Sequence, residues 1–173
     1  RISERRKFLN LSKAAEEGNP EAMILLGKAL EDGEGTLVDM QKAFDWYHRA
    51  ALCGSSEAMM LVAQAYANGK PVPQNGAEVF HWYMEAARAG NPDAMLWLGK
   101  HYRNNPNPDP EKAFYWYQRA AEAGNISAML CVGNCCCDSI GCTQDYEKAL
   151  FWFEKAHKLG NPVGTNNLGW MYL

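Results

Sequence analysis

Long apolar runs and an excess of charge of one sign are both missing from this chain of 173 residues. Its 17 basic and 20 acidic residues give a formal net charge of -3, and they do not form the basic footprint of a nucleic-acid-binding domain. No apolar run reaches the length of a membrane-spanning helix, so we expect no membrane insertion of this segment. Nucleic acid and lipid bilayers are therefore not the partners that the composition predicts.

A secretory leader and an initiator methionine are also missing. The N-terminal stretch RISERRKFLNLSKAAEEGNP is basic but has neither a long apolar core nor a cleavage site with small residues. We therefore expect that an upstream segment precedes this chain, and the targeting of the protein stays open.

What the chain has instead is an internal repeat. The stretches KAFDWYHRAALCGSSEAM, EVFHWYMEAARAGNPDAM, KAFYWYQRAAEAGNISAM and KALFWFEKAHKLGNPVGT begin at residues 42, 78, 112 and 148, a spacing of 36, 34 and 36 residues. Such a period predicts stacked repeats. We call positions with the same place in each repeat a repeat column. Two columns are invariant: Trp46, Trp82, Trp116 and Trp152, and Gly18, Gly54, Gly90, Gly124 and Gly160.

Each repeat is predicted to contain two helices. The first begins after a short polar residue suited to an N-cap, as at Asn19, which Pro20 follows at the first helical position. The second begins after a similar residue, as at Asp39, and ends at the recurrent glycine, as at Gly54. The fold class is therefore all-α. The predicted repeats are residues 19–54, 55–90, 91–124 and 125–160, with partial repeats at 1–18 and 161–173.

The recurring patterns A-M-x-x-L-G-x-x-Y and K-A-F-x-W-Y-x-x-A-A-x-x-G resemble Sel1-like repeats, relatives of tetratricopeptide repeats, over essentially the whole chain. The resemblance implies a right-handed α/α solenoid (superhelix) of helix-turn-helix repeats that serves as a protein-interaction scaffold. The chain departs from the pattern at Ala63, at Cys136 and at His157. Both ends lie out of register and lack polar caps, so we expect a fragment of a longer protein.

First helices of such solenoids line the inner, concave surface. Successive residues of a helix are rotated by about 100°, so the repeat pattern predicts which side of each first helix lies farthest from its packing positions. The residues on that side are polar except for one apolar column, Leu25, Leu61, Trp97 and Cys131. This column is either a row of anchors for a peptide or part of the core between first helices, and both interpretations stay open. The residues predicted to contact a protein or peptide partner are Leu25, Lys28, Leu61, Gln64, Asn68, Trp97, Lys100 and Asn104.

Five of the six cysteines lie in the stretch CVGNCCCDSIGC, residues 131–142. The repeat scatters them around one helix, which favours packing as small apolar residues. As an alternative, Cys131 and Cys135 share a helix face, and His101 lies in the column of Cys135, so the three could bind zinc or another soft metal. No CxxC pair supports that site. A Cys137–Cys142 disulfide would require an oxidising environment.

The leading hypothesis is a non-enzymatic scaffold or adaptor that binds a protein partner and needs no cofactor. A β-lactamase-like enzyme is the alternative, because one cysteine-rich subgroup of the resembling family is reported to handle β-lactams. The chain has no recurrent Ser–Lys or Ser–His arrangement and only four histidines, each in a different repeat column. Its cysteines do not recur at the repeat period either, which favours a reducing compartment, either the cytoplasm or, for a secreted effector, a host cytosol.

Overall fold

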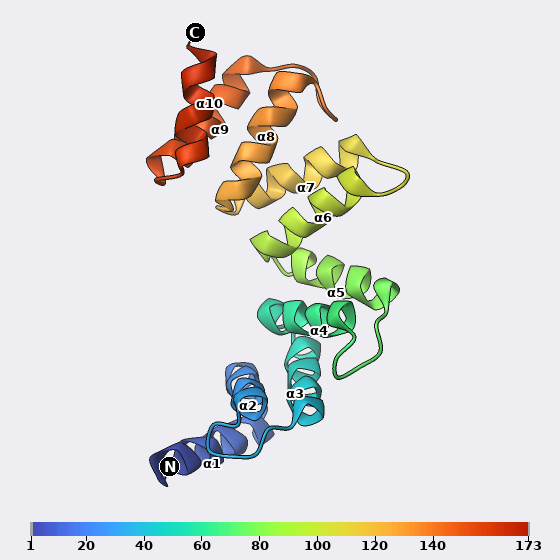
Figure 1. Cartoon of the computed structure of the whole chain (residues 1–173), viewed down its shortest axis with the longest axis vertical. Helices are drawn as coiled ribbons and strands as arrows, with labels where there is room; N and C mark the ends of the chain where they lie inside the picture. Colours follow the sequence, from blue (N-terminus) through green and yellow to red (C-terminus); the bar gives the residue numbers. More distant parts are fainter. Residues whose placement is uncertain (1, 173) are drawn as a thin grey trace. The chain divides into compact units, whose positions relative to one another are not determined.

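The computed structural model describes residues 2–172, and over this range it contains ten helices and no strand (Figure 1). The helices are α1 Ile2–Glu16, α2 Pro20–Asp32, α3 Met40–Leu52, α4 Ser56–Asn68, α5 Gly76–Arg88, α6 Pro92–Asn104, α7 Pro110–Glu122, α8 Ile126–Asp138, α9 Tyr146–Lys158 and α10 Pro162–Met171. The all-α prediction is confirmed. Within the described range, every helix is too short or too polar to cross a bilayer.

Two compact units make up the chain, Arg1–Ala89 and Gly90–Leu173, and we call them the first and second unit. In the first unit α2 packs on α1 and α3, and α4 packs on α3 and α5. In the second unit α7 packs on α6 and α8, and α9 packs on α8 and α10 (Figure 1). Within each unit, every helix thus contacts its neighbours in sequence, which is the arrangement expected of stacked helix pairs.

Side-chain caps begin the helices where the sequence predicts them. Asn19 Oδ1 accepts a hydrogen bond from the backbone N–H of Ala22 at 3.0 Å, and Asp39 Oδ1 accepts one from Lys42 at 2.9 Å. These oxygens satisfy amide groups that have no partner inside the helix. The recurrent glycine supplies the left-handed residue after the second helix, as at Gly54, whose φ is 92°.

The core is built from aromatic rings of the second helices that lie flat on glycines of the first helices. The Tyr47 ring covers Gly27, and the Tyr117 ring covers Gly99 so closely that a Cβ atom there would overlap the ring. Trp116 is also buried. Packing is therefore what these aromatic columns do, as their helical spacing predicts.

Replacing Gly99 with alanine is expected to destabilise the protein by about 1–3 kcal/mol, because the new methyl group overpacks against Tyr117. Gly169 is the matched control: it occupies the same repeat column, but a Cβ atom there meets nothing within 4 Å. Gly169→Ala should leave stability unchanged or raise it by up to about 1 kcal/mol through helix propensity. Urea denaturation measures both, and equal effects of the two substitutions would contradict the packing argument.

Candidate functional site

All eight residues predicted to contact a partner lie on the first helices α2, α4 and α6, and each lines a surface hollow. Two of these hollows belong to the first unit and one to the second. Leu25 is 45% exposed, whereas Leu61 and Trp97 are half-buried. The apolar column is therefore neither core nor fully solvated, which is the state expected of residues that can also contact a partner.

The hollow on α4 has a volume of about 240 Å³ and an apolar floor. Leu61, Gln64 and Asn68 line it from α4, and Phe44 and Tyr47 line it from α3. The two amide side chains are exposed, so they can donate hydrogen bonds to a peptide backbone while Leu61 contacts an apolar side chain.

An acidic group closes one side of this hollow. The hydroxyl of Tyr47 donates a hydrogen bond to Glu31 Oε2 at 2.7 Å, and both residues line the hollow. Tyr47 is buried, and burial together with this hydrogen bond to the carboxylate raises its pKa far above the ordinary value. The hydroxyl therefore stays protonated and serves as a permanent donor.

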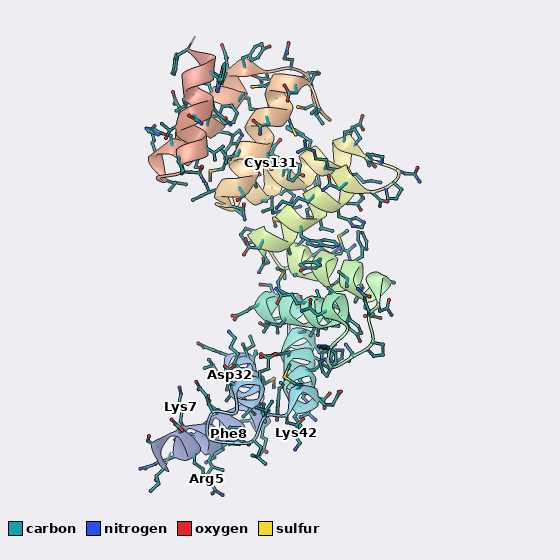
Figure 2. The ribbon with its side chains drawn as sticks, viewed as in Figure 1. Arg5, Lys7, Phe8, Asp32, Lys42 and Cys131 are labelled. Atoms are coloured by element: carbon teal, nitrogen blue, oxygen red, sulfur yellow. The ribbon has the colours of Figure 1, made fainter. Side chains whose placement is uncertain are left out.

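Leu25 and Lys28 line a second hollow of about 360 Å³ between α1 and α2. Lys7 and Phe8 of α1 and Asp32 of α2, labelled in Figure 2, also line it. Lys28 Nζ donates a hydrogen bond to Glu57 Oε1 on α4 at 2.8 Å, in an ion pair whose side chains are both exposed. Exposed pairs contribute at most about 1 kcal/mol, so this ion pair holds Lys28 only weakly.

On α6 the hollow has a volume of about 430 Å³, and Trp97, Lys100, His101 and Asn104 line it. The ring of Trp97 stacks on that of His101, with centroids 5.0 Å apart and planes inclined by 17°. Stacking holds the indole at the surface in one orientation. The hollow therefore combines a flat aromatic surface with an exposed ammonium group and an exposed amide.

The cysteine-rich segment forms no metal-binding group. Cys135 and Cys136 are buried, and burial raises the pKa of the Cys135 thiol to about 11 and that of Cys136 to about 12. Cys131, labelled in Figure 2, is half-buried. In residues 2–172 no three His, Cys, Asp or Glu side chains are placed to hold a metal ion, so Cys131, Cys135 and His101 are not brought together. The alternative metal site therefore has no support in the geometry.

The loop after α8 folds back on that helix. The thiol of Cys142 lies 3.5 Å from the carbonyl oxygen of Cys135, and Cys142 also interacts with the thiol of Cys136. All six cysteines are free, so Cys137 and Cys142 form no disulfide. Cys135 and Cys136 are buried and act as small apolar residues, as the repeat pattern predicts, whereas the other three cysteines of the cluster are half-buried.

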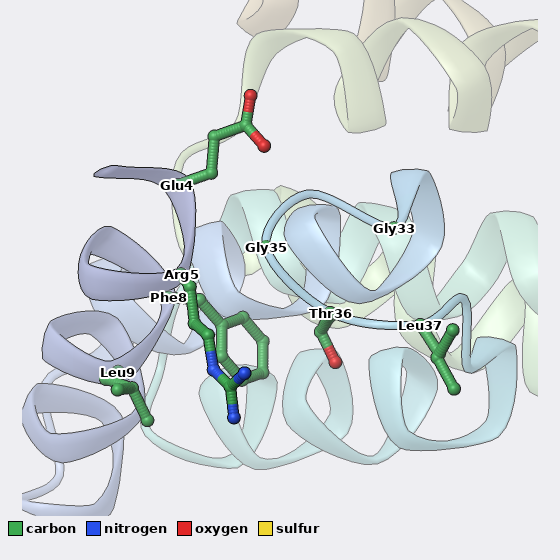
Figure 3. A pocket seen from close by; sticks show the side chains of 8 residues that line it. All are labelled: Glu4, Arg5, Phe8, Leu9, Gly33, Gly35, Thr36 and Leu37. Carbon is green, nitrogen blue, oxygen red and sulfur yellow. The ribbon is translucent and has the colours of Figure 1, made fainter. Parts of the chain in front are cut away.

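Sequence reasoning missed a hollow of about 540 Å³ between α1 and the loop that joins α2 to α3 (Figure 3). Arg5 and Phe8 lie next to each other on one side, and Leu37 of the loop, 86% exposed, lies on the other. Gly35 permits this approach: its φ is 72°, and a Cβ atom there would lie 2.6 Å from the carbonyl oxygen of Glu4. The sequence signal was the EDGEG stretch, which on its own predicts only a turn.

A second missed feature is a histidine–hydroxyl pair. His157 Nδ1 lies 2.7 Å from Thr165 Oγ1. Both side chains are exposed, so the pair lacks the desolvated surroundings in which a base activates a hydroxyl nucleophile. The geometry is that of a surface hydrogen bond.

Comparison with known proteins agrees with the repeat pattern. The family model "Sel1 repeat" matches residues 20–55, 56–91, 92–125 and 126–161. A protective antigen of uropathogenic Escherichia coli with an SLR fold is 35% identical over 95% of this chain and 36% of its own, with a TM-score of 0.84. A Sel1 repeat protein from Oxalobacter formigenes is 30% identical over 97% of this chain and 49% of its own, with a TM-score of 0.90.

The chain therefore spans between about a third and a half of the length of these two proteins. Cysteine rich protein B of Helicobacter pylori is 22% identical over 76% of this chain and 96% of its own, with a TM-score of 0.58, and this likeness concerns the fold alone. No curated protein matches the sequence.

The burial of the thiols predicts their reactivity. At pH 8 we expect iodoacetamide to modify the exposed Cys53 quickly and to leave Cys135 and Cys136 unmodified, since a thiol of pKa about 11 is only about one-thousandth ionised at that pH. Peptide mass spectrometry at successive times measures the modification of each cysteine, and Cys53→Ser should remove the fast reaction. Labelling of Cys135 as fast as Cys53 in the folded protein would contradict the assignment.

The same raised pKa values predict a loss of stability in alkali. In the unfolded chain these thiols ionise near their ordinary value of 9.0, whereas in the folded chain Cys135 ionises near 11 and Cys136 near 12. Their contribution is therefore complete below about pH 9 and is lost as the pH rises through 11 and 12. Urea midpoints between pH 8 and 11 measure the decline, which a Cys135→Ala/Cys136→Ala variant should show less steeply.

Proposed function

Because the chain belongs to the Sel1 repeat family, we propose that it is a non-enzymatic scaffold that binds a protein or peptide through the face lined by its first helices. Sel1 repeat proteins generally mediate protein–protein interactions. The main support for the proposal is that the repeat pattern and the surface hollows select the same residues independently. The residues that the repeat pattern places on the outward stripe of the first helices are also residues that line hollows on α2, α4 and α6.

The chemistry of these hollows suits a peptide. On α4 and on α6 a half-buried apolar side chain is followed by two exposed polar side chains three and seven positions later. Leu61 is followed by Gln64 and Asn68, and Trp97 by Lys100 and Asn104. An apolar anchor surrounded by hydrogen-bond donors is typical of interaction hot spots. The hollow on α4, about 240 Å³, is smaller than most pockets for small molecules and can accept a side chain of a partner.

Binding is favoured over catalysis by the state of the nucleophilic groups. The buried thiols have raised pKa values and stay protonated at neutral pH, and the His157–Thr165 pair lies in the open. Neither arrangement resembles an activated nucleophile. The proposed scaffold needs none, and this is why we place the function in the hollows.

Two single substitutions that introduce a negative charge, one in each unit, test the proposal. Leu61→Glu and Trp97→Glu should each reduce partner capture from a source-cell lysate at least about tenfold, because a buried anchor of this kind contributes more than about 1.4 kcal/mol. The matched controls are Leu52→Glu and Phe151→Glu, which alter exposed residues on second helices. Quantitative mass spectrometry of captured proteins compares the four variants, and circular dichroism verifies that all stay helical.

A partner set that all four variants retain would place binding outside the first-helix hollows. A partner set that the two control variants lose, and that the Leu61 and Trp97 variants retain, would assign binding to the second helices instead. Only selective loss with Leu61→Glu, Trp97→Glu or both supports the proposal.

A further inference from the structure

The hollow on α4 is lined from three helices, and all three belong to the first unit. Glu31 lines it from the end of α2, Tyr47 from α3 and Leu61 from α4. The hollow therefore lies within one compact unit and combines a carboxylate, an aromatic ring and an aliphatic side chain.

The carboxylate of Glu31 is held at the edge of this hollow with one oxygen open. Its Oε2 atom accepts the hydrogen bond of the Tyr47 hydroxyl at 2.7 Å, and Tyr47 is buried and therefore fixed. Among residues 2–172 no other hydrogen bond and no ion pair reaches this carboxylate, so Oε1 can still accept. Glu31 is half-buried, so water screens its charge less than that of an exposed acid.

The walls of the hollow suit a long side chain with a cationic end. Phe44 and Tyr47 are buried and Leu61 is half-buried. Lysine and arginine pack their aliphatic stems along apolar walls of this kind while the charged end reaches a polar group. Aromatic rings attract cations over their faces, which favours a basic side chain over an acidic one. The exposed amides of Gln64 and Asn68 add oxygen atoms that accept from such a cation.

One cation, Lys70, also lines the hollow. It follows α4 and is exposed, so water and salt screen its charge more strongly than that of the half-buried Glu31. Within the described range no ion pair joins the two residues, so Lys70 does not neutralise the carboxylate. The hollow therefore contains two opposite charges, and their separate removal shows which one a ligand uses.

We propose that the hollow on α4 binds a basic side chain, lysine or arginine, of the partner. The aliphatic stem lies against Phe44 and Leu61, and the ammonium or guanidinium group donates to Glu31, which Tyr47 holds in place. The inference rests on the proposed function, because it names the side chain that one of the first-helix hollows takes.

The probe is N-acetyl-lysine N-methylamide, titrated at pH 7 into the isotopically labelled protein, with sodium chloride as the ionic-strength control. We expect a saturable change in the side-chain amide resonances of Gln64 and Asn68, and none with sodium chloride. N-acetyl-norleucine N-methylamide keeps the aliphatic stem but lacks the ammonium group, so it should bind at least about tenfold more weakly. The corresponding arginine derivative is compared with the lysine probe, and preferential binding of either supports the inference and assigns the side chain.

Three substitutions separate charge from packing. Glu31→Gln keeps an acceptor for the Tyr47 hydroxyl but removes the charge, so binding of the lysine probe should fall about tenfold while that of the norleucine probe stays unchanged. Lys70→Gln removes the opposing charge and should strengthen binding of the lysine probe about twofold. Glu34→Gln alters an exposed acid that lines the hollow between α1 and α2, and as the matched control it should leave the response unchanged. Circular dichroism verifies that all three variants stay helical.

An equal response to the norleucine probe, or lysine-probe binding that Glu31→Gln retains in full, would overturn the inference. Tighter binding of N-acetylaspartate α-amide that Lys70→Gln weakens would overturn it too, because the hollow would then take an anion. The titrations need no partner, so the two proposals can fail separately. Lysine-probe binding with a partner set that all four charge variants retain leaves this subsite standing without the scaffold surface. Loss of capture by Leu61→Glu without lysine-probe binding overturns the subsite alone.

Discussion

Close contact between an aromatic ring and a glycine backbone is the interaction on which this structure depends. Tyr47 lies on Gly27, Tyr117 on Gly99 and Phe153 on Gly133, each joining the second helix of a repeat to its first helix. No side chain separates the ring from the backbone, so the two helices approach closely. The same contact carries the para position of the ring to the last turn of the first helix. There the hydroxyl of Tyr47 donates a hydrogen bond to Glu31, whereas Tyr117 lies beside Arg103.

One repeat column thus varies in residue type, although the packing positions around it are nearly constant. Glu31, Ala67, Arg103 and Cys137 occupy one place in four successive repeats, although the glycine and aromatic positions around them hardly change. The charge at this column differs between repeats, while the contact of the aromatic ring with the first-helix glycine recurs. Repeat proteins are suited to this division, because each repeat is stabilised mainly by its neighbours. The first and third repeats therefore differ in charge at this column while sharing one architecture.

The role of the cysteine-rich segment cannot be inferred from its composition alone, because it depends on the position of each cysteine in the repeat. Five cysteines within residues 131–142 are typical of a metal or redox site. Four of them point in different directions from α8 and the fifth lies in the following loop, and burial raises the pKa values of Cys135 and Cys136. Burial in apolar surroundings disfavours the thiolate, which is the form that binds metals and attacks electrophiles. These cysteines therefore pack like the alanines and tyrosines that other repeats have in their places.

By itself the sequence determined the helix pairs, their caps and the side of each first helix that faces outward, because these depend on local backbone chemistry and on a period of 34–36 residues. The eight residues that it predicts for partner contact all line hollows on α2, α4 and α6, together with other residues that it did not select. Only the tertiary structure decided that Lys28 pairs with Glu57, that Gly35 lines a hollow beside Arg5, and that Tyr47 donates a hydrogen bond to Glu31. These features depend on distances between side chains of different helices, and a repeat pattern specifies the column of a residue but not its neighbours across the helix interface.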